Sequence, residues 1–268
     1  NHGGRQLDAA PAPIDVLAMS VRLPAETLVP LLRALDLAAL NEPASCIVSG
    51  PAAACAELER VLAERGITVD SGGVRRLRTS HAFHSAMMEA AVAPMQAALQ
   101  QVHLLPPQLP LLSGVTGTWL SPEEAVSPHY WAQQLRQPVR FAECVGKLLT
   151  TPQPQLVLEV GPGRTLATAV LRHPLRQPEH AVLSSLPAAS ANTDAAQHFH
   201  GTRCSLWLAG VALRFDRPAQ GRRALAAQRQ PVLLARLTAP RAGFRTRRCR
   251  ACAETGSRRA RSPCRSRS

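Results

Sequence analysis

Apolar and polar positions follow a regular order from Ile14 to Arg78. Short apolar runs alternate with two longer stretches in which apolar residues recur every three or four positions, the spacing of an amphipathic helix. The predicted elements are a strand at 14–21, a helix at 24–35, strands at 37–40 and 46–49 joined by the turn Asn41-Glu42-Pro43, a helix at 52–65 and a strand at 74–78. This βαββαβ order predicts a ferredoxin-like subdomain at residues 14–78.

A second region, residues 79–185, alternates strands and helices in the manner of a parallel α/β sheet. Ser85 is a favourable N-cap, and an apolar stripe follows it at Met88, Ala91, Met95 and Leu99. The predicted elements are a helix after Ser85, a buried strand at 109–113, helices at 127–135 and 139–150, a strand at 155–160 and a helix from Gly161-Pro162-Gly163 to Leu171. The fold class is therefore α/β.

The two ends of the chain depart from this pattern. Residues 1–13 form a polar, proline-broken entry segment, and residues 186–220 combine a polar loop with a helix or apolar packing segment at 204–213. Residues 1–220 hold 17 Lys and Arg against 17 Asp and Glu, so the formal net charge of +13 lies in residues 221–268, which hold 14 Arg and one Glu. This basic tail is poor in large apolar residues, and we expect it to be disordered.

Two explanations of the basic tail are open. An arginine-rich segment can bind anions or nucleic acid nonspecifically. Aromatic residues that would stack on bases are not interleaved in it, which argues against a specific nucleic-acid partner. The composition also matches an out-of-frame reading of GC-rich DNA, which is the explanation that we favour.

The seven cysteines do not form a disulfide framework. Four of them lie among apolar residues, as reduced core thiols do. Cys249 and Cys252 form a lone CxxC without a second pair at zinc spacing, so no metal site is predicted. There is neither a signal peptide nor an apolar run of membrane-spanning length, so we expect a cytoplasmic protein that does not contact a membrane.

Candidate chemistry is concentrated in the heptapeptide Thr79-Ser80-His81-Ala82-Phe83-His84-Ser85, between a predicted strand and a predicted helix. Histidine titrates near neutral pH, so a histidine held at such a junction can move protons. Taken alone, a histidine pair before a helix is more often a surface or capping feature, and the flanking sequence has to decide.

The tripeptide Gly161-Pro162-Gly163 also has two interpretations. Glycines at the start of a helix can bind phosphate. The segment lacks a Gly-x-Gly-x-x-Gly run, however, so a tight strand-to-helix turn is favoured.

Five motifs in a fixed order resemble the acyltransferase domain of modular polyketide synthases, a family related to the malonyl-CoA:acyl carrier protein transacylases. The motifs are Asn41-Glu42-Pro43 with the strand that follows, His81-Ala82-Phe83-His84-Ser85, Tyr130-Trp131 with residues 134–141, Glu159-Val160-Gly161-Pro162-Gly163, and Trp207-Leu208-Ala209-Gly210-Val211, which is similar to the linker after such domains. The resemblance implies an α/β-hydrolase-like core, with its C-terminal part at residues 79–185, into which the ferredoxin-like subdomain is inserted.

The resemblance also implies a reaction. The parent domain transfers a malonyl-type extender unit from coenzyme A to the phosphopantetheine thiol of an acyl carrier protein, through a Ser-His acyl-enzyme. His84 matches the base that takes the proton of the serine hydroxyl. In the family a backbone carbonyl orients this histidine, and Gln134 occupies the matching position. The implied partners are malonyl-CoA, the carrier protein and the other domains of the synthase through a ketosynthase-side linker, with no bound cofactor.

Three residues match positions at which the family selects its extender unit. His81 and Phe83 complete the His-Ala-Phe-His form, which is the malonyl-type signature, whereas methylmalonyl-type members usually have Tyr-Ala-Ser-His. A phenyl ring in place of serine leaves less room for an α-methyl branch, and one methyl group is worth about 1–3 kcal/mol of discrimination. Asn41 matches a residue that lines the same pocket.

The family's nucleophile lies in a Gly-His-Ser-x-Gly elbow, and no Gly-x-Ser-x-Gly occurs in this sequence. The family's oxyanion-hole glutamine and carboxylate-binding arginine are likewise missing. We therefore expect the C-terminal part of an acyltransferase domain, inactive alone, with apolar faces and unpaired strand edges in residues 80–185. The alternative function is a non-catalytic scaffold or docking fragment whose ferredoxin-like subdomain contacts a carrier protein.

Overall fold

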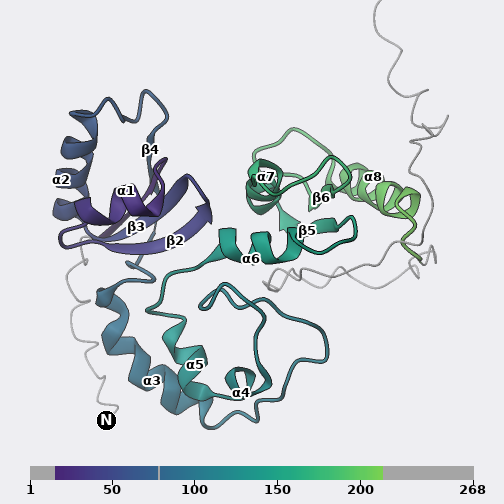
Figure 1. Ribbon diagram of the computed structural model, residues 1–268, viewed down its shortest axis with the longest axis horizontal. Helices are drawn as coiled ribbons and strands as arrows, with labels where there is room; N and C mark the ends of the chain where they lie inside the picture. Colours follow the sequence, from purple (N-terminus) through teal and green to yellow (C-terminus); the bar gives the residue numbers. More distant parts are fainter. Residues whose placement is uncertain (1–15, 78, 214–268) are drawn as a thin grey trace, which may run out of the picture. The chain divides into compact units, whose positions relative to one another are not determined.

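The computed structural model describes residues 16–77 and 79–213 (Figure 1). The predicted entry segment at 1–13 and basic tail at 221–268 lie outside the described residues. The fold class is α/β, as predicted, with one antiparallel and one parallel sheet.

Residues 16–77 form a four-stranded antiparallel sheet in the order β2-β3-β1-β4 (Figure 1). Its elements are, in chain order, β1 (Val16–Val21), α1 (Ala25–Leu28), the 3-10 turn η1 (Val29–Leu31), β2 (Asp36–Glu42), β3 (Ser45–Pro51), α2 (Ala52–Ala63) and β4 (Val74–Leu77). The hairpin turn lies at Pro43 and Ala44, so Asn41 and Glu42, predicted to be turn residues, are the last residues of β2.

One face of this sheet carries the hydrophobic core. Met19 of β1 and Val48 of β3 are fully buried, and they pack in one cluster with Leu28 of α1 and Leu62 of α2. Burial of each such side chain contributes about 1.5–3 kcal/mol. Because side chains alternate along a strand, the residues of β2 and β3 that lie next to core residues point to the opposite face of the sheet. The core does not occupy that opposite face, so a site can form there.

The predicted helix at 24–35 is much shorter than expected. Pro30 follows α1 and has no amide hydrogen to continue the i to i−4 ladder, so the chain tightens into η1 and ends there. Leu35 still enters the core, at 7% exposure, but from the start of the next segment rather than from a helix.

The second region holds the remaining helices and a pair of parallel strands. Its elements are η2 (Ala86–Met88), α3 (Glu89–Leu99), α4 (Pro122–Ala125), α5 (Pro128–Gln133), α6 (Phe141–Leu149), β5 (Leu156–Pro162), α7 (Thr165–Arg172), β6 (Ala181–Leu186) and α8 (Ala195–Leu208). Strands β5 and β6 pair in parallel, which is the type of sheet predicted for this region. Ser85 caps η2, since its hydroxyl accepts the Met87 amide at 3.2 Å.

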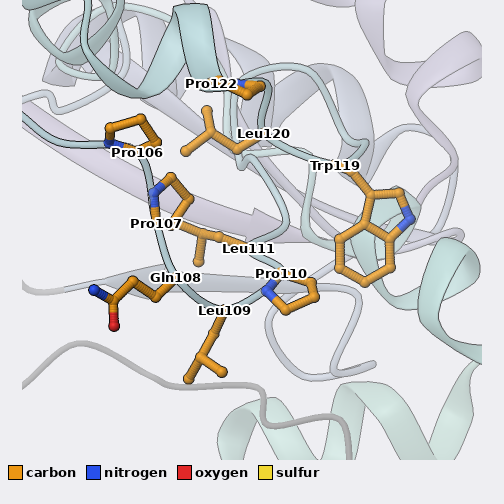
Figure 2. A pocket seen from close by; sticks show the side chains of 9 residues that line it. All are labelled: Pro106, Pro107, Gln108, Leu109, Pro110, Leu111, Trp119, Leu120 and Pro122. Atoms are coloured by element: carbon orange, nitrogen blue, oxygen red, sulfur yellow. The ribbon is translucent and has the colours of Figure 1, made fainter.

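The prediction of a buried strand at 109–113 is wrong. Pro110 cannot donate to a strand ladder, and the segment keeps a single bridge, between Leu112 and Trp119. Leu109 is 62% exposed rather than buried. The prolines and leucines here line a groove of about 350 Å³ (Figure 2), made by Pro106, Pro107, Gln108, Leu109, Pro110, Leu111, Trp119, Leu120 and Pro122.

Two other elements differ from the sequence prediction. Strand β6 was not predicted, and α8 begins nine residues before the predicted apolar segment at 204–213. The first half of α8 is polar and has no apolar stripe to reveal it. It starts at a cap instead, since the Asp194 carboxylate accepts the Ala196 amide at 2.8 Å. Among the described helices, none is long and apolar enough to cross a membrane.

Two buried histidines in this region act as hydrogen-bond acceptors. His173 Nδ1 accepts the Leu175 amide at 3.2 Å, and His180 Nδ1 accepts the Gln155 amide at 2.8 Å. Burial lowers the pKa of both imidazoles. A protonated imidazole has no lone pair for these amides, so the fold requires both rings to be neutral.

We therefore expect acid to weaken the fold. Below pH 6.5, the ordinary histidine pKa, the unfolded chain binds protons that the folded chain does not, so the free energy of unfolding falls as the pH drops from about 6.5. The urea midpoint should be lower at pH 5.5 than at pH 7.5. In His180→Asn, whose amide oxygen accepts but does not titrate, this difference should shrink, whereas the exposed His103→Gln should leave it unchanged. Equal midpoints at the two pH values in the unmodified chain would refute the expectation.

Candidate active site

The second histidine of the heptapeptide has an unusual backbone. His84 has φ of 60°, and among the described non-glycine residues no other has a positive φ. This left-handed conformation costs about 1–2 kcal/mol for a residue with a Cβ. The His84 amide donates to the Leu135 carbonyl at 3.0 Å, one of the contacts that hold the residue in place. Strain of this kind persists where the surroundings over-determine it, commonly at functional sites.

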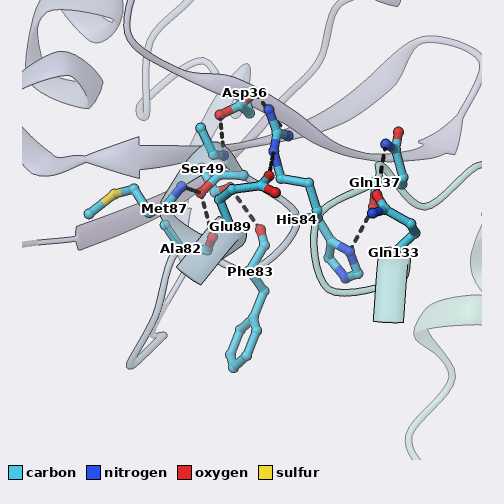
Figure 3. A network of polar contacts seen from close by, with 12 residues as sticks. Asp36, Ser49, Ala82, Phe83, His84, Met87, Glu89, Gln133 and Gln137 are labelled. Atoms are coloured by element: carbon cyan, nitrogen blue, oxygen red, sulfur yellow. Dashed lines mark hydrogen bonds and ion pairs between the residues drawn. The ribbon is translucent and has the colours of Figure 1, made fainter. Parts of the chain in front are cut away.

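The imidazole of His84 is fixed through one ring nitrogen. Nδ1 lies 2.9 Å from the carbonyl oxygen of Gln137, and Figure 3 shows the ring turned toward the segment that carries this residue. A carbonyl oxygen can only accept, so Nδ1 must carry the proton. In the neutral ring Nε2 is then the bare nitrogen, able to accept a proton. Within the described residues Nε2 has no hydrogen-bond partner.

The carbonyl differs from the one predicted. Gln134 was expected to orient His84, but the contact is made by Gln137, three residues further along. Gln134 lies at the C-cap of α5 with helical backbone. Gln137 precedes Pro138, which disfavours the helical conformation of the preceding residue and turns its carbonyl away from the helix. The Gln-Pro dipeptide was the signal in the sequence that could have identified Gln137.

The segment after Gln137 is anchored to the first sheet. Val139 forms a parallel bridge with Ala39 of β2. Its amide donates to the Ala38 carbonyl at 2.9 Å, and its carbonyl accepts the Leu40 amide at 2.8 Å. The free edge of β2 therefore pairs with the chain at Val139, and this pairing restrains the position of the nearby Gln137 carbonyl.

The residues predicted to select the extender are only partly brought together. The rings of His81 and Phe83 are neighbours, with centroids 5.5 Å apart, and Phe83 is 44% exposed. In Figure 3 the phenyl ring points away from the polar contacts around His84. Asn41 lies at the end of β2, half-buried, and within the described residues it forms no hydrogen bond or ring contact with the heptapeptide.

No serine or cysteine of the described residues is placed as a nucleophile for His84. Two hydroxyls that contact the heptapeptide backbone are committed elsewhere, since Ser85 donates to the Ala82 carbonyl at 2.6 Å and Ser49 to the Phe83 carbonyl at 2.8 Å. Burial raises the pKa of the Cys46, Cys55 and Cys144 thiols to about 11, which keeps them protonated. Nor do three His, Cys, Asp or Glu side chains meet as metal ligands within residues 16–77 and 79–213.

The turn at Gly161-Pro162-Gly163 fits the structural interpretation better than phosphate binding. Gly163 has φ of 96°, a conformation suited to glycine. Its amide donates to the Pro187 carbonyl at 3.1 Å, and the amide of Gly161 to the Ser185 hydroxyl at 2.9 Å. At the N-terminus of α7 the Glu159 carboxylate accepts the Ala167 amide at 2.8 Å, so a carboxylate of the protein occupies the position that an anion would take.

Fold and geometry together define an α/β protein that holds a histidine with a bare Nε2 at a strained strand-to-helix junction. The sequence matches the family described as acyl transferase domain over residues 19–213, and the chain belongs to that family. A 187-residue stretch is 35% identical to a subunit of the phenolphthiocerol/phthiocerol polyketide synthase of Mycobacterium tuberculosis, covering 69% of this chain and 12% of that protein. A 133-residue stretch is 34% identical to the polyketide synthase GfsB of Streptomyces halstedii, covering 50% of this chain and 2% of that protein.

Solved acyltransferase domains share the fold. The acyl transferase domain of SpnD, in complex with 2-(pent-4-yn-1-yl)malonyl, superposes with a TM-score of 0.66 at 29% identity, over 72% of this chain and 46% of that one. The acyltransferase domain from the second module of the salinomycin polyketide synthase gives 0.64 at 29% identity, over 73% and 44%. The chain thus matches less than half of each solved domain.

Glu159 should be a stabilising cap of α7. We expect Glu159→Ala to lower the free energy of unfolding by about 0.5–2 kcal/mol, the usual loss on removing a helix cap, and Glu159→Gln to lower it less because an amide oxygen still accepts. Urea unfolding monitored by circular dichroism measures both. The exposed Glu179→Ala serves as control. A Glu159→Ala variant as stable as the control would mean that the carboxylate does not cap α7.

Proposed function

We propose that this chain supplies the histidine base of a serine–histidine acyltransferase in polyketide synthesis. Its substrates would be malonyl-CoA, as acyl donor, and the phosphopantetheine thiol of an acyl carrier protein, as acceptor. The observation that carries the proposal is the hydrogen bond from His84 Nδ1 to the Gln137 carbonyl, which leaves Nε2 as the proton acceptor. Membership in the acyl transferase family, in which polyketide synthases recur among the relatives, supports the reaction class.

The reaction divides into two proton cycles at His84. In the first, Nε2 takes the proton of the serine hydroxyl as the serine oxygen attacks the thioester carbonyl, and returns it to the sulfur of coenzyme A as the carbon–sulfur bond breaks. In the second, Nε2 takes the proton of the phosphopantetheine thiol, whose sulfur attacks the acyl-serine ester. The proton then returns to the serine oxygen as that ester bond breaks.

The Gln137 carbonyl suits this cycle. When Nε2 is protonated, the ring carries a positive charge, and the carbonyl dipole stabilises it through Nδ1–H. When Nε2 is bare, the same hydrogen bond keeps the ring in the tautomer that can accept again. A neutral partner achieves both without placing a second negative charge near a substrate that itself carries a carboxylate.

The serine would come from the part of an acyltransferase domain that this chain does not match. Two observations support this division. The solved domains are more than twice as long as the matched region, and the groove that holds Leu109 and Trp119 exposes apolar surface of a kind that folded domains cover. In this proposal residues 16–77, with strand order β2-β3-β1-β4, are the ferredoxin-like subdomain, and residues 79–186 belong to a hydrolase-like core.

Phe83 is the proposed selector of the extender unit, with His81 beside it. The contact between the two rings supports a substrate pocket that both residues line. The phenyl ring is 44% exposed, so it can face a ligand. The SpnD domain was solved with a substituted malonyl group, which supports a malonyl-type ligand for this family. Asn41 stays in the proposal as a residue of the same pocket on the resemblance alone.

The proposal is tested in a composite domain, in which residues 16–213 replace the matching segment of the salinomycin second-module domain. We expect this domain to move radiolabelled malonyl groups from malonyl-CoA to a carrier protein, and His84→Ala to slow the transfer about 10²–10⁴-fold, the usual contribution of a positioned base. The exposed His103→Ala should leave the rate unchanged, and the 268-residue chain alone should give no transfer.

Either of two results would contradict this. One is a composite domain that transfers equally well with and without His84. The other is transfer by the 268-residue chain alone, whether or not His84→Ala abolishes it.

The extender preference should depend on Phe83. We expect Phe83→Ser in the composite domain to reduce the preference for malonyl-CoA over methylmalonyl-CoA by about 10- to 200-fold, the range for one methyl group in an apolar pocket. The ratio of the two kcat/KM values measures this. Phe199→Ser is a matched control, since Phe199 is 43% exposed and lies on α8. A ratio that moves equally in both variants would show that Phe83 does not select the extender.

A further inference from the structure

Two polar side chains of the first sheet reach the heptapeptide from a single cross-strand pair. Asp36 of β2 and Ser49 of β3 lie directly opposite each other in the antiparallel register. Val48, the neighbour of Ser49, is in the core, so Ser49 points to the other face of the sheet and Asp36 points there with it. The Cβ atoms of such a pair are about 4.5–5.5 Å apart, so both side chains reach the same part of the sheet surface.

This pair holds the chain on both sides of His84. The Ser49 hydroxyl, on a residue 1% exposed, donates to the carbonyl of Phe83 at 2.8 Å. The Asp36 carboxylate accepts the amide of Ala86 at 2.8 Å. Phe83 precedes His84 and Ala86 follows it by two residues, so both contacts act on the backbone that carries the left-handed residue (Figure 3).

The same pair is linked to the segment that orients the imidazole. Because Ala39 pairs with Val139 in parallel, Asp36 lies beside Arg136, and the two side chains approach to 3.4 Å. Arg136 also pairs with Glu89 at the start of α3, at 3.5 Å. Its two chain neighbours, Leu135 and Gln137, provide the carbonyls that accept from the amide and the ring of His84.

We infer that Asp36 and Ser49 are positioning residues for His84, holding its strained backbone so that Nδ1 meets the Gln137 carbonyl and Nε2 faces outward. The inference rests on the proposed role of His84 as the base, but it concerns the geometry of the ring rather than the reaction. Without these two hydrogen bonds the backbone at His84 relaxes toward the right-handed region. The imidazole then swings away from Gln137, and its tautomer is no longer fixed.

The test uses the full 268-residue chain labelled with ¹³C and ¹⁵N at histidine. Long-range nitrogen–carbon correlations identify which ring nitrogen of His84 is protonated. We expect the Nδ1–H form in the unmodified chain, and in Asp36→Ala and Ser49→Ala a shift toward the tautomer mixture of the exposed His103, which serves as reference in the same spectrum.

Two matched variants separate positioning from general destabilisation. Asp36→Asn keeps an oxygen that accepts the Ala86 amide and loses the charge, so we expect it to retain the Nδ1–H form. Ser20→Ala removes a hydroxyl from the same face of the sheet that has no hydrogen bond within the described residues, and should also retain it. A second sample of each variant, labelled uniformly with ¹⁵N, gives the amide signals of α2, which packs on the opposite face, and these report whether the variant is folded. Should Ser49→Ala fail to fold, the Asp36→Ala and Asp36→Asn pair decides the question.

The inference is overturned if folded Asp36→Ala and Ser49→Ala keep the Nδ1–H form, or if Asp36→Asn loses it as fully as Asp36→Ala. In the composite domain the Ala variants should lower kcat by up to about 10²-fold with KM for malonyl-CoA unchanged, as misplacement of a catalytic group does. If the tautomer of His84 changes in the Ala variants but the composite domain transfers no malonyl groups, the proposed function is overturned and the positioning role stands. If the composite domain is active but the tautomer does not change in the Ala variants, the positioning role is overturned and the proposed function stands.

Discussion

The hydrogen bond between His84 Nδ1 and the Gln137 carbonyl is the contact on which the rest of the site depends. It joins segments 53 residues apart, and it decides which ring nitrogen is free. A histidine without such a partner samples both tautomers and several rotamers, so Nε2 would be bare and correctly aimed for a small part of the time. One neutral acceptor removes that ambiguity without altering the local charge.

Strand β2 restrains the geometry of this hydrogen bond. On one edge it pairs with β3, which places Asp36 beside Ser49 under the heptapeptide, and on the other it pairs with Val139, which places Gln137. The left-handed backbone of His84 is therefore restrained by side chains of β2 and β3 and by the segment that pairs with the free edge of β2. A residue that costs about 1–2 kcal/mol in isolation persists here because several hydrogen bonds would be lost if it relaxed.

The sequence predicted well those parts of the molecule in which local pattern and tertiary packing agree. The short apolar runs that contain Met19 and Val48 identified two strands of the first sheet, and Ser85 identified the start of a helix. The sequence-based prediction failed where a single residue overrides the pattern of apolar positions. Pro30 shortened a helix with correct leucine spacing, and Pro110 left an apolar run out of any sheet. The start of helix α8 was missed because its first half has no apolar face, and only residues from 204 onward were predicted as a helix or packing segment.

For the candidate site the limit was different. The family motif identified His84, but a motif gives residue types and not hydrogen-bond partners, so the orienting carbonyl was assigned three residues too early. Asp36 and Ser49 could not be found from the sequence, since their link to the heptapeptide depends on the register of two strands and on which face of the sheet is left free. The Gln137-Pro138 dipeptide, in contrast, could have identified the orienting carbonyl from the sequence, because proline disfavours the helical conformation of the residue before it.

The charges around the site also bear on how the work of an acyltransferase domain is divided. A malonyl group carries a carboxylate that needs a cationic partner, preferably an arginine with its planar pair of donors. Three arginines near β2 are each paired with a carboxylate of the chain: Arg136 with Asp36 and Glu89, Arg140 with Glu143 at 2.7 Å, and Arg172 with Glu42 at 3.4 Å. Because each is neutralised by a carboxylate of this chain, recruiting one for the substrate would leave that carboxylate unpaired. In the proposed reaction the described residues would orient the base, and recognition of the extender's carboxylate would fall to the segment that provides the serine.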